Sequence, residues 1–163
     1  MVIGKGFQDQ EATVPMDFLR QEGAEVVAVG PDTGEIKGLH GAVIRVDNTF
    51  GELDPTSFDA MVIPGGRSPA YLRKSEEARS FVANFAATGK PLAAICHGGQ
   101  LLAAAGLVKG LTMTGYPKIR EEMLEAGADF VDREVVIDGN IITSRVPEDL
   151  PAFNAALKEK LLA

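Results

Sequence analysis

The sequence predicts a single α/β domain over residues 1–163, in which a mainly parallel sheet is covered by helices. Three short segments are apolar on consecutive residues rather than on alternate ones, namely Val26–Val29, Ala60–Ile63 and Leu92–Ile95. A strand needs this pattern when both of its faces are buried, as in a parallel sheet between two layers of helices. Segments with helical spacing alternate with these runs, which is typical of an α/β layer sandwich.

Two of the helical segments have clear signatures. Between residues 75 and 88 the apolar side chains recur at helical spacing, with Ser75 suited to the N-cap and Gly89 to the position after the C-terminus. The last segment of the chain repeats this spacing and predicts a closing amphipathic helix. Its apolar residues are Phe153, Ala156, Leu157 and Leu161.

Two other segments depart from the alternation of strands and helices. Residues 35–46 are expected to form a small extension that ends in the strand Val43–Val46. The runs Val135–Ile137 and Ile141–Thr143, joined by Asp138-Gly139-Asn140, predict an antiparallel hairpin. At the start of the chain, Met1–Ile3 would be a very short first strand for a sheet of this kind.

The composition excludes several classes of function. The net charge is −7, from 16 basic and 23 acidic residues. An acidic surface repels phosphate backbones and anionic lipids, so neither a nucleic-acid partner nor a membrane partner is expected. Apolar stretches such as Leu101–Ala105 are too short to cross a bilayer. With one cysteine, Cys96, and two histidines, His40 and His97, we expect no disulfide and no metal, and a cytoplasmic location.

Cys96 stands where a buried strand meets a helix. It directly follows the run Leu92–Ile95, and a helix-forming segment begins at Gln100. The pattern Ala94-x-Cys96-x-Gly98 provides the small neighbours of a nucleophile elbow, which exposes its side chain above the sheet. The free N–H groups of the helix start should lower the pKa of the thiol below its ordinary value of about 8.5. The alternative is a small buried hydrophobic residue without chemistry.

A second turn is expected at the same edge of the sheet. The run Ala60–Ile63 leads into Pro64 and the pair Gly65 and Gly66, where backbone N–H groups can approach a ligand closely. We expect Gly65 and Gly66, together with the N–H of His97, to form an oxyanion hole. The alternative is that the two glycines only shape the turn between strand and helix.

Glu11 is a candidate partner of the thiol. Pro15 lacks an N–H group and is expected in the first turn of a helix, so that helix should begin near Glu11 or Ala12. Glu11 would then lie at the carboxyl edge of the sheet, beside Cys96, where ligands bind in open α/β sheets. There it could accept a hydrogen bond from the thiol or act as a general base. Alternatively, it is an acidic residue that favours a helix N-terminus.

Five motifs occur together over nearly the whole chain. They are Phe7-x-Asp9-x-Glu11, Pro64-Gly65-Gly66, Ala94-Ile95-Cys96-His97-Gly98, Thr114-x-Tyr116-Pro117 and Ser144-Arg145-x-Pro147. With these motifs the sequence resembles the ThiJ/PfpI family, in particular its PfpI branch, which is itself similar to class I glutamine amidotransferase domains. The resemblance implies a flavodoxin-like three-layer sandwich, no cofactor, and a homodimer or sometimes a hexamer.

The resemblance also assigns roles to individual residues. It implies that Cys96 is the nucleophile, with His97 beside it and Glu11 facing it, and that Tyr116 lines the substrate pocket. Gln8 is expected to contact the substrate, since it stands where the family usually has a second glutamate. Tyr116 and Arg145 also have structural interpretations, as a packed ring and as part of a surface ion pair. His40 matches no catalytic element and is interpreted as a surface residue.

Two further positions depart from the family pattern. Gly99 stands where a proline usually follows the Cys-His-Gly run, so the turn after the elbow should be looser. Ala70 occupies the position from which peptidase-type members supply an acidic residue to the histidine across a subunit interface. Without that carboxylate a protease-like triad is incomplete, which disfavours a peptidase.

The resemblance implies one of several activities, since family members are described as glyoxalases, deglycases, peptidases and stress-response proteins. We expect a cysteine-dependent stress-response enzyme that acts on small reactive carbonyls, as a glutathione-independent glyoxalase or deglycase. The alternatives are an intracellular cysteine peptidase and a non-catalytic redox sensor or chaperone-like stress protein, since an exposed thiolate is readily oxidised.

Overall fold

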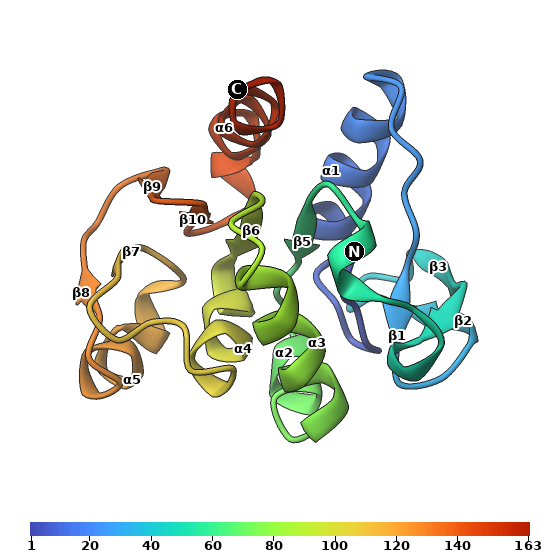
Figure 1. Ribbon diagram of the computed structural model, residues 1–163, viewed down its shortest axis with the longest axis horizontal. Coiled ribbons are helices and arrows are strands. Elements are labelled where there is room, and N and C mark those ends of the chain that lie inside the picture. The colour runs from blue at the N-terminus through green and yellow to red at the C-terminus, as the bar shows by residue number, and fades with distance from the viewer.

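A computed structural model describes all residues from Met1 to Ala163. Its centre is a four-stranded sheet in the order β5-β6-β10-β9 (Figure 1). The strands are β5 (Met61–Ile63), β6 (Leu92–Ile95), β10 (Ile141–Ser144) and β9 (Val136–Asp138). β5, β6 and β10 are parallel, and β9 is antiparallel to β10. The predicted mainly parallel sheet and the predicted hairpin near residue 139 are therefore confirmed.

The sheet continues beyond β5 through short segments. The N–H of Val2 donates to the carbonyl of Val62 at 3.0 Å, and that of Ile3 donates to Val29 at 2.9 Å. β1 (Val29–Gly30) then pairs with β4 (Asn48–Thr49). The expected strand at 26–29 is therefore realised only at its end. Backbone groups of this segment bond to a side chain instead of a neighbouring strand: the N–H of Ala28 donates to the Asp47 side chain at 2.9 Å.

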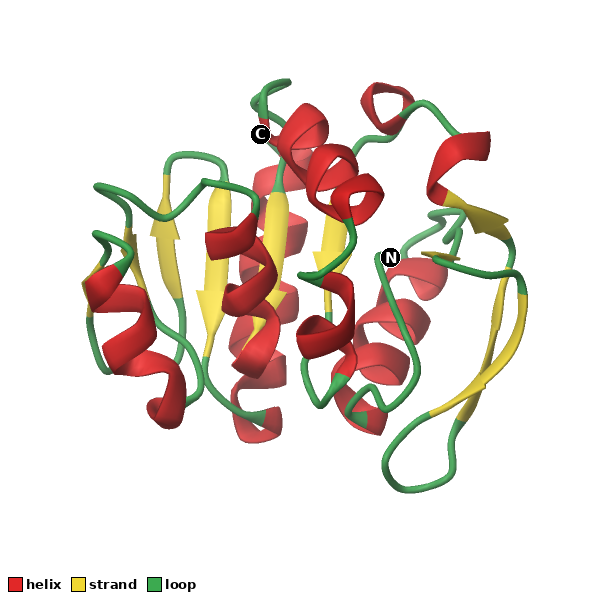
Figure 2. Cartoon of the chain, turned by 90° about the horizontal axis from the view of Figure 1, so that it is seen from below, coloured by secondary structure: helices red, strands yellow, loops and turns green.

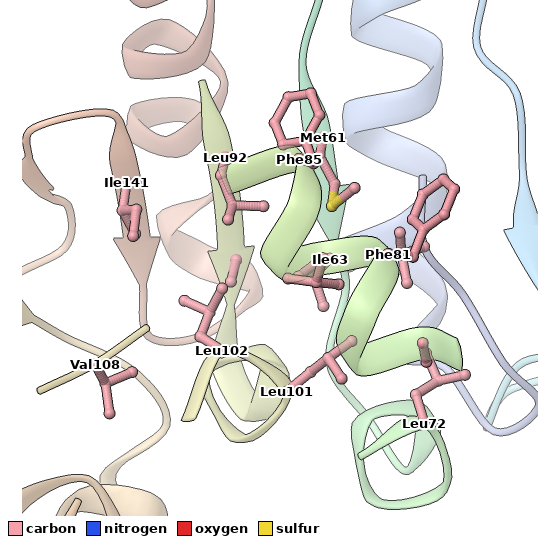
Figure 3. Packing of buried hydrophobic residues seen from close by; sticks show 14 of the residues in the cluster. Met61, Ile63, Leu72, Phe81, Phe85, Leu92, Leu101, Leu102, Val108 and Ile141 are labelled. Atoms are coloured by element: carbon pink, nitrogen blue, oxygen red, sulfur yellow. The ribbon is translucent and has the colours of Figure 1, made fainter. Parts of the chain in front are cut away.

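Helices cover both faces of the sheet, as Figure 2 shows. On one face, α3 (Glu76–Ala86) and α4 (Gly99–Ala104) pack on the strands, beside α2 (Ser68–Leu72). On the other face lie α6 (Leu150–Leu162) and α1 (Asp9–Gln21). Residues alternate between the two cores: Ile63, Leu92 and Ala94 face α3 and α4, whereas Val62, Ala93 and Ile95 face α6. Figure 3 shows the first of these cores.

Smaller elements surround this centre. β2 (Gly34–Lys37) and β3 (Val43–Val46) form the predicted extension as an antiparallel hairpin. β7 (Thr112–Met113) pairs in parallel with β8 (Asp129–Phe130), next to α5 (Arg120–Glu125). Short 3-10 turns connect several elements. They are η1 (Phe50–Glu52), η2 (Pro55–Ser57), η3 (Cys96–Gly98), η4 (Pro117–Ile119) and η5 (Pro147–Asp149).

The boundaries of two helices test the sequence signals. The N-cap of α3 is Ser75, whose hydroxyl accepts the N–H of Ala78 at 3.2 Å, as predicted. The predicted start of α1 near Glu11 is wrong, because α1 begins at Asp9 and contains Pro15 in its interior. Packing of its buried face outweighs the lost hydrogen bond of the proline. No helix has both the length and the apolar surface needed to span a bilayer.

Candidate active site

Cys96 forms the predicted elbow. It follows β6 directly and is the only residue other than glycine with a positive φ, at 61°. The chain turns through η3 into α4 with no intervening loop. A Cβ atom on Gly98 would lie 2.8 Å from the carbonyl oxygen of Ile63, so the turn accepts only glycine there. A left-handed backbone at a side-chain-bearing residue is costly and persists where the surrounding structure holds it in place.

The environment of the sulfur differs from the sequence prediction. Cys96 is 7% exposed, so the expectation of an exposed thiol is wrong. Burial raises the pKa of the Cys96 thiol, and the charge of the Glu11 carboxylate raises it further. The N–H groups of His97 and Gly66 act in the opposite direction and are outweighed. The predicted lowering of the thiol pKa is therefore wrong, because desolvation exceeds what two N–H groups supply.

The side chain of Glu11 lies next to Cys96, with Gly65 packed between them. The side chain is completely buried, and its Oε1 accepts the N–H of Gly65 at 2.9 Å. Its Oε2 has no hydrogen-bond partner. A Cβ atom on Gly65 would lie 2.5 Å from this Oε1 and 2.9 Å from the Cys96 Cβ, so only glycine separates the two residues. Burial raises the pKa of Glu11 from 4.5 to about 8, so the carboxyl is largely protonated at neutral pH.

The turn after β5 supplies backbone donors. Because the N–H of Gly65 is already bound by Glu11, this group is not free to hold an oxyanion. The N–H groups of Gly66 and His97 are directed at the Cys96 sulfur, where they favour the thiolate. Gly66 has a φ of 77°, and a Cβ atom there would clash with the backbone of Gln8. An oxyanion hole requires such donors at the position of the substrate's oxygen rather than at the sulfur, so the oxyanion hole at Gly66 and His97 stays a prediction.

His97 lies between the thiol and an aromatic ring. Its Nδ1 is 3.4 Å from the Cys96 Sγ, and its ring centroid is 4.6 Å from that of Tyr116. The N–H of Tyr116 donates to the carbonyl of Cys96 at 3.1 Å, which ties this segment to the elbow. Burial lowers the pKa of His97, so its imidazole is neutral at pH 7 and can accept a proton.

The other residues singled out in the sequence are Gln8, Gly99, Arg145 and His40. Gln8 lies beside the site, but its Oε1 caps α1 by accepting the N–H of Glu11 at 2.8 Å. Gly99 has helical dihedral angles of −57° and −25°, so the turn keeps its shape without a proline. Arg145 is structural, since it forms ion pairs with Asp149 and Asp132. His40 is exposed, as expected for a surface residue.

Sequence reasoning missed two polar arrangements around the site. Asp9 accepts the backbone N–H groups of His40 and Ala42, at 2.9 and 2.8 Å, and so ties the β2–β3 hairpin to α1. Glu122 accepts hydrogen bonds from Arg73 and Gln100, which lie on other elements. The sequence signal for Asp9 was its place in the motif Phe7-x-Asp9-x-Glu11, because the helix itself was expected to begin only near Glu11. No cluster of three or more His, Cys, Asp or Glu side chains could hold a metal ion.

Comparisons with known proteins point to one family. The DJ-1/PfpI family matches residues 1–160. The chain is 46% identical over 147 residues to the deglycase PfpI of Pyrococcus furiosus, covering 90% of this chain and 89% of the relative. It is 42% identical over 157 residues to protein/nucleic acid deglycase 2 of Escherichia coli, covering 94% and 91%.

Solved structures share the fold. The crystal structure of a two-domain protein from Anabaena variabilis, with DJ-1/ThiJ/PfpI-like and ferritin-like domains, superposes with a TM-score of 0.96 at 39% identity. The match covers 98% of this chain and 46% of that longer one. Drosophila melanogaster DJ-1beta gives a TM-score of 0.90 at 28% identity, covering 98% and 87%. The chain therefore has the DJ-1/ThiJ fold.

Proposed function

Because the chain belongs to the DJ-1/PfpI family, we propose that it is a deglycase of the PfpI type that acts on small reactive carbonyls and their amine adducts. The observation that carries the proposal is the contact of the Cys96 thiol with a protonatable, fully buried Glu11 across Gly65. A nucleophile beside a group that can move a proton between carbons is what the conversion of a 2-oxoaldehyde into a 2-hydroxy acid requires.

The first step would be addition of sulfur to the aldehyde carbon. Since the thiol of Cys96 is protonated at neutral pH, neutral His97 would take its proton through Nδ1, 3.4 Å away. The sulfur then forms a bond to carbon, and the carbonyl oxygen becomes an oxyanion near the N–H groups of Gly66 and His97. Return of the proton from His97 to that oxygen gives a neutral hemithioacetal. For an amine adduct, the sulfur would displace the amine at the same carbon, and the amine would leave with the proton that His97 has taken from the thiol.

The second step would move a proton between adjacent carbons. In its carboxylate form, Glu11 would remove the proton from the hemithioacetal carbon and deliver one to the neighbouring carbon. The hydroxyl proton of the first carbon would pass to the neighbouring carbonyl oxygen, so that the first carbon becomes the thioester carbonyl and the second carries the hydroxyl group. The product, a thioester of a 2-hydroxy acid, is an isomer of the hemithioacetal, so the step needs no oxidant or reductant. Water then hydrolyses the thioester and restores the Cys96 thiol. For methylglyoxal, the sum is addition of one water molecule to give lactate.

The proposed function is tested by lactate formation from methylglyoxal. Wild-type protein should form lactate, and Cys96→Ala and Glu11→Gln should abolish it. Glu121→Gln is the matched control, since Glu121 is an exposed carboxylate paired with Arg120 on the surface. Lactate formation that is undiminished in Cys96→Ala would refute the proposal.

The same protein preparation separates the alternatives. Casein hydrolysis that persists through size-exclusion chromatography and disappears in Cys96→Ser would indicate a peptidase. Ala70 disfavours this outcome, since the methyl side chain cannot orient His97. Stoichiometric oxidation of Cys96 to sulfinic acid by mild peroxide, without turnover of methylglyoxal, would indicate a redox sensor.

The proposal also covers the detailed fold class, the location, the oligomeric state and the substrate contacts. The helix layers on both faces of the sheet support a flavodoxin-like three-layer sandwich formed by one domain. We also infer a cytoplasmic homodimer or hexamer from the family resemblance, which size-exclusion chromatography with light scattering tests. The substrate contacts of Gln8 and Tyr116 belong to the same proposal, and kinetics of Gln8→Ala and Tyr116→Phe test them.

A further inference from the structure

The segment that leads into Glu11 is hydrogen-bonded to the turn after β5. The N–H of Gln8 donates to the carbonyl of Gly65 at 3.1 Å, and the N–H of Gly65 donates to Glu11 Oε1 at 2.9 Å. Gly65 also fills the space between the two reacting side chains, since a Cβ atom there would lie 2.5 Å from Glu11 Oε1 and 2.9 Å from the Cys96 Cβ. The placement of the carboxyl beside the thiol therefore depends on where this segment lies.

A second turn, between β2 and β3, holds the same segment. The N–H of Leu39 donates to the carbonyl of Phe7 at 2.9 Å. Asp9, the first residue of α1, accepts the N–H of His40 at Oδ1 over 2.9 Å and the N–H of Ala42 at Oδ2 over 2.8 Å. Both carboxylate oxygens of Asp9 are therefore occupied by this turn, two residues before the buried carboxyl of the site. We call this pair of hydrogen bonds the Asp9 clamp.

The clamp is closely packed. A Cβ atom on Gly38, in the same turn, would overlap Asp9 Oδ1 and lie 2.8 Å from the ring of Phe7. Phe7 is completely buried, so its ring has no free space to move into. Asp9 is also the only side chain that forms hydrogen bonds to the β2–β3 turn. Among the side chains, Asp9 is therefore the one whose loss would free the start of α1 from this turn.

We propose that Asp9 is a positioning residue for Glu11: by binding the β2–β3 turn, it fixes the start of α1 so that the Glu11 carboxyl stays buried against Gly65. The proposal rests on the proposed role of Glu11 in moving a proton between the substrate carbons. A displacement of about 1 Å at a reacting group can slow a reaction about 100-fold, so a loose helix start should reduce turnover.

The direct test is a carbon-13 NMR titration of the glutamate carboxyls, which needs no turnover. The signal of Glu11 is assigned by its absence in Glu11→Gln. In Asp9→Ala, water should reach the unpaired Oε2 of Glu11, and the pKa of Glu11 should fall from about 8 to below about 7. Asp17→Asn removes an exposed carboxylate of the same helix and should leave this pKa unchanged. An unchanged Glu11 pKa in folded Asp9→Ala, or an equal fall in Asp17→Asn, would overturn the proposal.

Two further variants separate the contacts of Asp9 from its charge. Gly38→Ala keeps the carboxylate but places a methyl group against Asp9 Oδ1, so the pKa of Glu11 should fall here too. Asp9→Asn keeps one acceptor oxygen, and its effect should be smaller than that of Asp9→Ala. The titratable groups that act on Glu11 are the Cys96 thiol and Glu148, and both variants leave them in place. A wild-type pKa in Gly38→Ala beside a lowered one in Asp9→Asn would show an effect of charge and overturn the clamp, even if Asp9→Ala does not fold.

Kinetics complete the test. Asp9→Ala should lower kcat for methylglyoxal by about 10- to 100-fold and leave KM within about twofold, since both oxygens of Asp9 are bound to the β2–β3 turn. Ser75→Ala loses a helix cap elsewhere and should keep the wild-type kcat, which controls for loss of stability alone. A loss confined to KM would contradict a positioning role. Absence of turnover by the wild-type protein would refute the proposed function, while the titration of Glu11 would still test the clamp.

Discussion

The buried carboxyl of Glu11 should reduce the stability of the protein at neutral pH, and Glu11→Gln should remove this cost. The structure raises the pKa of Glu11 from 4.5 to about 8, because the side chain is fully buried. Between these two pH values the folded protein keeps a proton that the unfolded chain has released. Stability from this group is therefore complete below about pH 4.5 and is lost as the pH rises towards about 8.

The magnitude follows from the size of the pKa difference. Each pKa unit corresponds to about 1.4 kcal/mol, so a difference of about 3.5 units gives a loss of about 5 kcal/mol over the full interval. A glutamine is neutral throughout, and its side-chain oxygen can still accept the Gly65 N–H. The free energy of unfolding of Glu11→Gln should therefore rise relative to wild type by about 3 kcal/mol between about pH 5 and about pH 7.5.

Urea unfolding followed by far-ultraviolet circular dichroism measures this difference, since the chain has no tryptophan for fluorescence. Glu121→Gln is the control, because Glu121 is 79% exposed in its side chain and should show no such pH dependence. A constant difference between Glu11→Gln and wild type, or a difference that shrinks as the pH rises, would refute the account of Glu11.

Three further predictions follow from the geometry. Gly65→Ala should abolish turnover and destabilise the protein, since its Cβ would lie 2.5 Å from Glu11 Oε1; Gly51→Ala, where a Cβ meets nothing within 4 Å, should do neither. The kcat/KM for methylglyoxal should rise with pH to a plateau above about 8, because Glu11 must be ionised to remove a proton, and a profile that is flat between about pH 6 and about pH 9 would contradict this role. Ser75→Ala should lower the free energy of unfolding in urea by about 1 kcal/mol through loss of the α3 N-cap, with turnover unchanged.

Local sequence patterns were sufficient where neighbouring residues decide the structure. The elbow at Cys96 depends on small residues two positions away on each side, and these are visible in the sequence. The start of α3 at Ser75 and the turn of the β9–β10 hairpin are equally local. The meeting of Glu11 with Cys96 followed from a rule of topology, because both come at the carboxyl edge of one sheet.

Features that depend on distant residues were not predictable in this way. The raised pKa of the Cys96 thiol results from its cover by Glu11 and the turn after β5, which no local pattern encodes. The N–H of Gly65 is bound by a side chain 54 residues away. The bridge of Arg73, Gln100 and Glu122 likewise joins residues that the fold alone brings together.

Covalent attachment of the substrate to Cys96 is the central claim, and NMR of carbon-labelled methylglyoxal bound to Glu11→Gln tests it most directly. With proton transfer between the carbons blocked, one equivalent of a hemithioacetal signal should accumulate on the protein, and Cys96→Ala should lack it. The same signal in both variants, or no sulfur-bound carbon in Glu11→Gln, would contradict attack by this thiol.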